Sequence, residues 1–277
     1  ACQGCGVCAI GKRKSRLAQQ SMSKDIRPRL APDIAPSEEA AGEKPDASVR
    51  QRDDLGRKAA QYRIWYRKAG PAAWLSQLEL GRVLERACRR AGLPLSFSKG
   101  FHPLPRLSFG RALPVGLVSM SEWVNLVLRE DVPPETLRRA LSEQLPEGLD
   151  VLKVHRLTLG KRQPQPDYET FILNLRTDPV AARELRERLI QAGAAESLPV
   201  TKKTKKGEKT VDAAPMLRRV AGGPGGSLLL TLDWSSDYLN PLTLLAAVVP
   251  EAGPAEMELI KTGQFFTLQT LPDGYAA

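Results

Sequence analysis

Apolar and polar residues follow strand-like and helix-like spacings from Tyr62 onward. Tyr62 to Tyr66 alternates as a short strand does, and Gly92 and Pro94 end the helix predicted after it. The apolar face of that helix consists of Leu80, Val83, Leu84, Ala87, Cys88 and Ala91. The remaining elements are predicted as strands at 95–97, 106–109, 123–128 and 149–154 and a helix at 133–145. We interpret the order as β-α-β-β-α-β, the ferredoxin-like arrangement.

The second half of the chain repeats this outline. Its predicted elements are a strand at 168–175, a helix at 179–192, a strand pair at 198–204 and 209–220, a strand at 228–232, a helix at 241–248 and a strand at 257–261. The pair turns at Lys206-Gly207. We therefore predict an α+β fold of two tandem ferredoxin-like units, at 61–160 and 166–265, followed by a tail at 266–277.

The residues before Tyr62 differ in composition. Residues 1–10 are a small Cys/Gly cluster, and residues 11–60 hold few large apolar side chains among many charged residues, Pro and Ala. Such a segment buries too little surface to offset its ordering entropy, so we predict a disordered linker over 11–60. The chain starts with Ala rather than Met, and we expect residues 1–10 to be the end of a longer Cys-rich segment.

Composition and charge narrow the function classes. Lys and Arg number 41 against 31 Asp and Glu, and this surplus of +10 favours polyanionic partners such as nucleic acid. Aromatic residues make up only 5%, which argues against a large stacking surface for nucleotides. The longest apolar run, Leu242 to Val249, is far shorter than the ~20 residues of a membrane span. We expect a cytoplasmic chain with no membrane contact.

Three cysteines form the pattern C-x2-C-x2-C at Cys2, Cys5 and Cys8. Thiolates this close can bind one metal, and the spacing matches the first three ligands of a ferredoxin-type iron–sulfur run or part of a zinc site. Both sites need another ligand, which we expect upstream, because Lys12 stands where the run would place its fourth Cys. The alternative is three reduced thiols. Cys88, on an apolar helix face, is predicted to be a core residue.

Two basic segments are candidates for nucleic-acid binding. The outer face of the first helix carries Arg82, Arg86, Arg89 and Arg90. The loop after it adds Lys99, His102 and Arg106, with Gly and Pro fixing its backbone. Arginines so placed suit phosphate contacts, whereas internal Glu–Arg pairing on a solvated helix is the alternative. For the loop, the alternative is a turn shaped by proline with an incidental histidine.

A third basic segment is the predicted hairpin tip, with Lys202, Lys203, Lys205 and Lys206. It suits phosphate contacts, but lysines also keep strand pairs from aggregating. The one weak catalytic candidate is His102, for which spacing identifies no carboxylate partner. Glu122 and Asp150 stand as isolated carboxylates. The residues alone show no complete active site.

The run from 75 to 123 resembles the radical-SAM-linked domain of unknown function, and the likeness extends over most of 62–265. The matching positions are Leu75-Ser76, Arg89 to Pro94, Gly100-Phe101, Pro103, Pro105, Leu113 to Gly116, Glu122 and residues 204–212. The chain departs from the family at Gln77, Glu79, Leu104 and Asn125, where His, Asp, His and an acidic residue are common. This chain therefore cannot fill in the same way a metal or acid–base role that the family's two His residues serve.

The resemblance implies that this chain is the C-terminal part of a fusion to a radical SAM iron–sulfur enzyme with a cobalamin-binding-type N-terminal domain. S-adenosylmethionine would bind in the upstream radical SAM domain, which is also the expected partner. We expect an accessory module that recognises RNA, such as tRNA or rRNA, for modification rather than catalysing by itself. One alternative is a module that docks on the radical SAM domain without nucleic-acid contact. Another is a hydrolase or nuclease, which would need His102 beside a carboxylate.

Overall fold

The computed structural model describes residues 53–160, 164–204, 207–253 and 255–266. The sites predicted at Cys2, Cys5, Cys8, Lys205 and Lys206 lie outside the described residues, as does the side chain of Lys203. The tail and almost all of the predicted linker lie outside them as well. The linker prediction extended to residue 60, whereas Asp53–Gly56 form the 3-10 turn η1.

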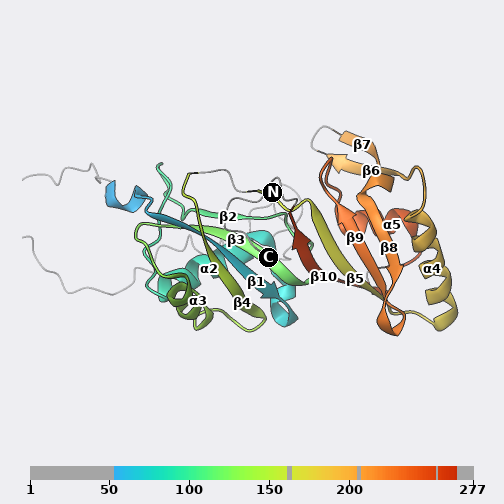
Figure 1. The fold of residues 1–277 in the computed structure, drawn as a ribbon, viewed down its shortest axis with the longest axis horizontal. Coiled ribbons are helices and arrows are strands. Elements are labelled where there is room, and N and C mark those ends of the chain that lie inside the picture. The colour runs from blue at the N-terminus through green and yellow to red at the C-terminus, as the bar shows by residue number, and fades with distance from the viewer. Residues whose placement is uncertain (1–52, 161–163, 205–206, 254, 267–277) are drawn as a thin grey trace, which may run out of the picture. The chain divides into compact units, whose positions relative to one another are not determined.

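The first half has the connectivity β-α-β-β-α-β (Figure 1). Its elements are β1 (Ala60–Lys68), the 3-10 turn η2 (Gly70–Trp74), α2 (Gln77–Arg90), β2 (Leu107–Phe109), β3 (Val118–Leu128), α3 (Pro134–Ser142) and β4 (Leu149–Leu157). β1 pairs antiparallel with β3 and β4, and β2 pairs antiparallel with β3. The strand predicted at 95–97 is wrong, because Leu95 and Phe97 form only isolated bridges.

The second half has the same connectivity with one insertion. Its elements are β5 (Tyr168–Leu175), α4 (Pro179–Ala192), β6 (Pro199–Thr204), β7 (Gly207–Asp212), η3 (Ala214–Met216), β8 (Leu217–Gly222), η4 (Pro224–Gly226), β9 (Leu228–Asp233), α5 (Pro241–Val248) and β10 (Met257–Phe265). The strands run in the order β10-β5-β9-β8, and β6 and β7 form a separate two-stranded sheet.

The strand predicted at 209–220 is in fact two strands. The carboxylate of Asp212 accepts hydrogen bonds from the backbone N–H groups of Leu198 and Ala214, at 2.8 and 3.0 Å. These bonds end β7 and start the turn η3, after which the chain enters the large sheet as β8. The hairpin is thereby separated from the large sheet.

The two halves share one sheet of eight strands. β10 pairs in parallel with the start of β3, at Ile260↔Val118 and Lys261↔Ser119, which joins the halves in the order β4-β1-β3-β10-β5-β9-β8. β2 pairs with the same edge of β3 nearer to the end of that strand, at Val124 to Leu126. Between them, Gln264 accepts a hydrogen bond from the Trp123 indole at 3.2 Å and donates to the Ser121 carbonyl.

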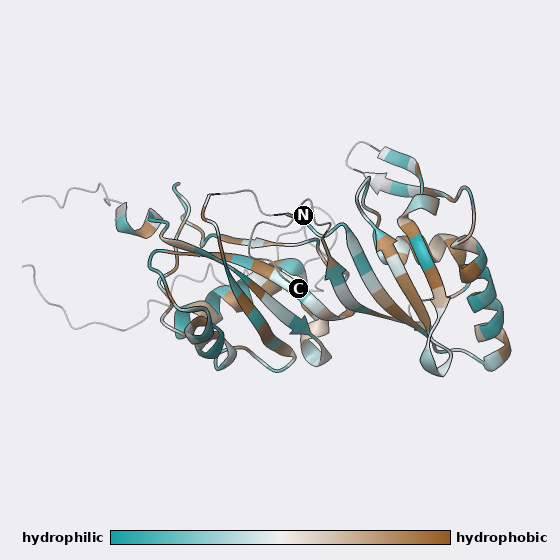
Figure 2. Ribbon diagram, in the orientation of Figure 1, coloured by the Kyte–Doolittle hydropathy of each residue, from teal (hydrophilic) through white to brown (hydrophobic). Residues whose placement is uncertain are grey.

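All four α-helices cover one face of the sheet. One core packs α2 and α3 on β1, β3 and β4, and another packs α4 and α5 on β5, β9 and β10. Glu122 of β3 and Lys261 of β10 form an ion pair, and each side chain points to the side of its strand that faces the core. Both cores therefore lie on the same face of the sheet. In Figure 2, hydrophilic colour follows the exposed side of α4.

Among the described residues, the helices are too short or too polar to span a bilayer.

A buried ionic cluster lies between the two cores. The ammonium group of Lys261 forms ion pairs with Glu122 at 2.8 Å and Glu169 at 3.2 Å, and the Trp234 indole donates to Glu169 at 2.9 Å. Burial raises the pKa of Glu122, although Lys261 opposes the shift. Burial by itself would lower the pKa of Lys261, but the two carboxylates reverse this and raise it. We call this set the junction triad.

Candidate nucleic-acid interface

The loop between α2 and β2 is held in shape by its own hydrogen bonds. The Ser98 N–H donates to the Leu104 carbonyl at 2.8 Å, and the Leu104 N–H donates to the Ser98 hydroxyl at 3.0 Å. These bonds close the segment 98–104, which we call the tip loop. Lys99, Phe101 and His102 are all exposed on it.

Two of the predicted arginines meet at the base of the tip loop. Arg106 donates from Nε to the Phe97 carbonyl at 3.0 Å. The guanidinium of Arg89 lies over the Phe97 ring at 5.3 Å and pairs with Glu85 at 2.8 Å. Phe97 therefore contacts both arginines, Arg106 through its carbonyl and Arg89 through its ring.

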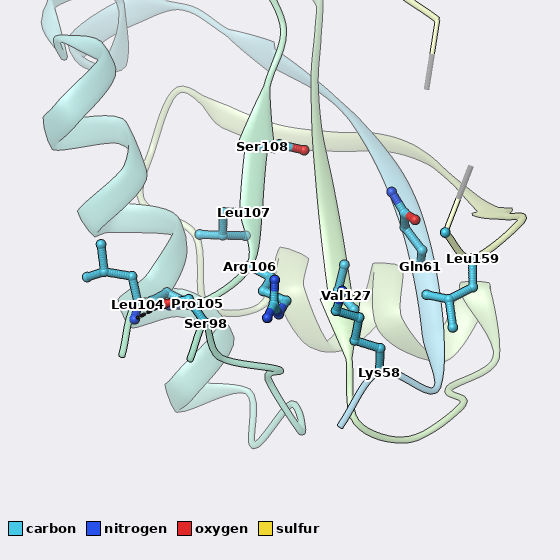
Figure 3. A pocket seen from close by; sticks show the side chains of 11 residues that line it. Lys58, Gln61, Ser98, Leu104, Pro105, Arg106, Leu107, Ser108, Val127 and Leu159 are labelled. Atoms are coloured by element: carbon cyan, nitrogen blue, oxygen red, sulfur yellow. Dashed lines mark hydrogen bonds between the residues drawn. The ribbon is translucent and has the colours of Figure 1, made fainter. Parts of the chain in front are cut away.

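A groove opens beside Arg106, on the sheet face opposite the helices (Figure 3). It has a volume of about 440 Å³. Its lining residues are Lys58, Gln61, Ser98, Leu104, Pro105, Arg106, Leu107, Ser108, Val127, Leu159 and Gly160. Val127 on β3 lies between the strands that supply the two walls, and Lys58 and Arg106 give the groove two cationic groups. The volume falls in the range of ~300–1,000 Å³ typical of ligand sites.

The stretch of sequence that contains the tip loop and β2 carries charges of one sign. From Arg86 to Ser121 the sequence holds six Lys or Arg residues and no Asp or Glu. The nearest carboxylate before this stretch, Glu85, is paired with Arg89, and the nearest after it, Glu122, is buried with Lys261. The tip loop and β2 therefore carry no carboxylate in their own stretch of sequence, whereas Asp54 of the neighbouring turn η1, whose Leu55 carbonyl accepts the Phe97 N–H at 2.8 Å, pairs with Arg129.

The helix arginines divide into two groups. Arg82 and Arg86 are exposed on α2, and the described residues give neither of them an ion pair within 4 Å. Arg89 is paired with Glu85, and Arg90 donates to the side chain of Gln144 at 3.3 Å and to its carbonyl. Internal Glu–Arg pairing thus accounts for one of the four arginines, Arg89, and Arg90 is held by the segment after α3.

The hairpin is not part of the same surface. Figure 1 shows β6 and β7 on the second half, away from α2 and β2. Lys202 is turned inward and holds Asp237 at 2.8 Å and the Tyr238 carbonyl at 3.1 Å. Its interpretation as a phosphate contact is therefore unsupported, and its observed role is to attach the hairpin to the second half.

The catalytic candidate His102 has no acid–base partner in the described part of the chain. Its ring contacts Phe101 edge to face, with 5.2 Å between centroids, and no hydrogen bond joins it to a carboxylate. The described residues also contain no group of three His, Cys, Asp or Glu side chains placed to hold a metal. Cys88 is in the core as predicted, and burial raises the pKa of its thiol to about 12.

Sequence reasoning missed part of the groove. Lys58 precedes β1 in the segment interpreted as linker, Gln61 is one of several polar residues in β1, and Ser108 is the one polar residue of the short strand β2. Their only sequence signal is strand alternation, which places Gln61 on the face opposite Tyr62. It does not show that β2 and β1 stand on either side of β3.

Comparisons with known proteins identify the family of this chain. No curated protein matches the chain. Among solved structures it is similar to a chain of the "Crystal Structure of a Cbf5-Nop10-Gar1 Complex", with 11% identity and a TM-score of 0.34 over 84% of this chain. The chain spans 59% of the length of that protein. A family profile matches residues 61–241, more than half of the sequence. The chain therefore belongs to the family described as "Uncharacterized protein conserved in bacteria (DUF2344)".

Proposed function

We propose that this chain is an RNA-binding, substrate-recognition module of a radical SAM enzyme. The observation that carries the proposal is the groove with Lys58 and Arg106, next to a tip loop that carries Lys99 and no carboxylate. Lysine and arginine supply phosphate contacts, while Gln61 and Ser108 offer hydrogen-bonding groups and Val127 an apolar surface. This mixture suits a nucleotide better than a purely apolar ligand.

We also propose that each half is a ferredoxin-like unit. The orders β4-β1-β3-β2 and β10-β5-β9-β8 match when β8 is taken as the second strand and the β6–β7 hairpin as an insertion. Other RNA-binding modules of this connectivity bind RNA on the sheet face that their helices leave open. The groove lies on that face of the first half, which supports the RNA proposal.

The radical SAM association rests on sequence resemblance alone. Under this proposal Cys2, Cys5 and Cys8 hold an iron–sulfur cluster or zinc together with an upstream ligand, and the radical SAM domain binds S-adenosylmethionine. These cysteines lie outside the described residues, so the metal proposal depends on their spacing. The module itself would recognise the RNA that the upstream domain modifies.

The test is binding of the full chain to cellular tRNA and rRNA over a salt series. The double variant Lys58→Ala/Arg106→Ala removes two groove cations, and Arg183→Ala/Arg219→Ala removes two exposed cations of the second half as a charge-matched control. We expect the groove variant to lower the slope of log K against log salt by about 1.4 for single strands, and the control to keep it. Equal losses in both variants would contradict a groove site.

A docking module is the second candidate, favoured by an exposed apolar patch. Trp74 is 71% and Leu78 80% exposed, and Val115 is also exposed. A Cβ placed on Gly116 would lie 3.2 Å from the Trp74 ring, so the loop before β3 packs beside it. The test is the affinity of purified radical SAM domain for wild type and for Trp74→Ser/Leu78→Ser. A tenfold or greater loss would favour docking, and no binding to wild type would exclude it.

A further inference from the structure

The tip loop presents an aromatic ring to solvent. The side chain of Phe101 is 96% exposed, although water contact with an apolar ring is unfavourable. Two Ser98–Leu104 hydrogen bonds close the base of the loop that carries the ring. Among the described residues, the Phe101 ring contacts the His102 ring edge to face, and this contact leaves most of Phe101 exposed.

The exposed ring and the groove belong to one short segment. Ser98 and Leu104, which form the two ends of the tip loop, both line the groove, and Phe101 lies midway between them. A ligand in the groove therefore contacts residues that are only three positions from Phe101 in the sequence. Lys99 stands between the ring and Ser98 and adds positive charge to the same segment.

We propose that Phe101 stacks on an unpaired base of an RNA strand whose neighbouring nucleotide occupies the groove, so that the ligand is single-stranded rather than duplex. This inference rests on the proposed function. Bases inside an A-form duplex are already stacked on each other and offer no free face to a protruding ring. An unpaired base does, and aromatic side chains next to cations are the usual platform for it.

Chemistry favours RNA over a lipid surface as the occupant. Membrane-bound segments bury a continuous apolar face, whereas Phe101 is flanked here by Gly100 and His102, and the groove contains amide, hydroxyl and cationic groups. A base with its attached phosphate satisfies both the apolar ring and these polar groups. Anionic vesicles are therefore included in the test as a competing ligand.

The experiment measures fluorescence anisotropy of the full chain with an RNA of about 12 nucleotides, single-stranded or annealed to its complement. Phe101→Ala should weaken single-strand binding by about 5- to 150-fold, the range expected for loss of one stacked base, and leave duplex binding unchanged. Phe101→Trp should restore binding, with quenching of its indole fluorescence on titration. Val180→Ala, an exposed apolar residue of the second half outside the tip loop, is the matched control and should bind as wild type does.

The outcomes distinguish failure of this inference from failure of the RNA-binding proposal on which it rests. If wild type binds RNA and Phe101→Ala binds equally well, or loses duplex and single-strand affinity alike, the stacking inference is wrong and the RNA-binding proposal stands. If wild type binds neither RNA form, both are wrong. If phosphatidylglycerol vesicles bind in a Phe101-dependent way and RNA does not, the ring inserts into lipid and both are overturned.

Discussion

Replacing Lys261 by methionine tests the reasoning about the junction triad. The ammonium group is almost fully buried and is the cation paired with both Glu122 and Glu169, at 2.8 and 3.2 Å. Methionine fills a similar volume but carries no charge. The variant therefore leaves two buried carboxylates within one site, with Glu169 still accepting a hydrogen bond from Trp234 at 2.9 Å.

The expected loss follows from the burial of the pair. Removing one partner of a buried ion pair costs about 3–5 kcal/mol, because the remaining charge stays desolvated. A domain of about 200 residues loses roughly 2–4 °C in Tm per kcal/mol, so Lys261→Met should lower Tm by about 6–20 °C. Replacing both carboxylates by glutamine in the same chain should recover most of this loss.

Urea unfolding at several pH values supplies the second readout. In Lys261→Met, burial without a counter-charge holds the pKa of Glu122 above its value in the unfolded chain, so the folded state binds more protons and stability falls as pH rises. The deficit relative to wild type should thus be larger at pH 8 than at pH 5. A loss below about 1 kcal/mol, or a deficit independent of pH, would refute the argument.

Three further predictions concern the described fold. Cys88 should resist alkylation until the chain unfolds, because burial raises its pKa to about 12; the assay is iodoacetamide labelling of a variant that lacks the three N-terminal cysteines. The free energy of unfolding should fall as pH drops below 6.5. Burial, Lys153 and Arg63 lower the pKa of His155 in the folded chain, so the unfolded chain takes up the proton first. His155→Gln should reduce this dependence on pH in urea titrations. Gly148→Ala should cost more than about 2 kcal/mol of unfolding free energy, because the residue has φ of +86° and a Cβ would lie 2.1 Å from the Ala69 carbonyl oxygen.

Each of these has a contradicting result. Labelling of Cys88 at the rate of a free thiol would show that the α2 face opens readily. An unchanged pH slope in His155→Gln would assign the titration to other groups. For Gly148→Ala the matched control is Gly160→Ala, which has a similar φ of +82° but no atom within 4 Å of the added Cβ. Equal costs in the two alanine variants would mean that the contact with Ala69 adds nothing.

Local signals predicted the helices best. The bounds predicted for α4 match the structure because Pro179 follows a capping Asp178 and Gly193 comes directly after the last turn. The start of β3 was missed by five residues, since Val118 to Ser121 follow a Pro/Gly-rich loop and their strand partners lie in β1 and β10, far away in sequence. Pairing of this kind leaves no local pattern.

The same limit applies to the candidate site. The tip loop was identified because Lys99, His102 and Arg106 are close in sequence. The roles of Lys202 and Glu122 were not, because their ionic partners Asp237 and Lys261 come from distant segments. A cation that has a carboxylate partner in the fold and one that has none look alike in the sequence.

The parallel pairing of β10 with β3 has a consequence for synthesis. β3 ends at Leu128 and β10 begins at Met257, so the ribosome adds about 130 residues between them, which takes roughly 6 to 26 s. Until then Glu122 lacks Lys261, and the start of the β3 edge is an open strand that a second nascent chain can pair with. A chaperone that occupies this edge while the second half is translated would protect the chain at its most aggregation-prone moment.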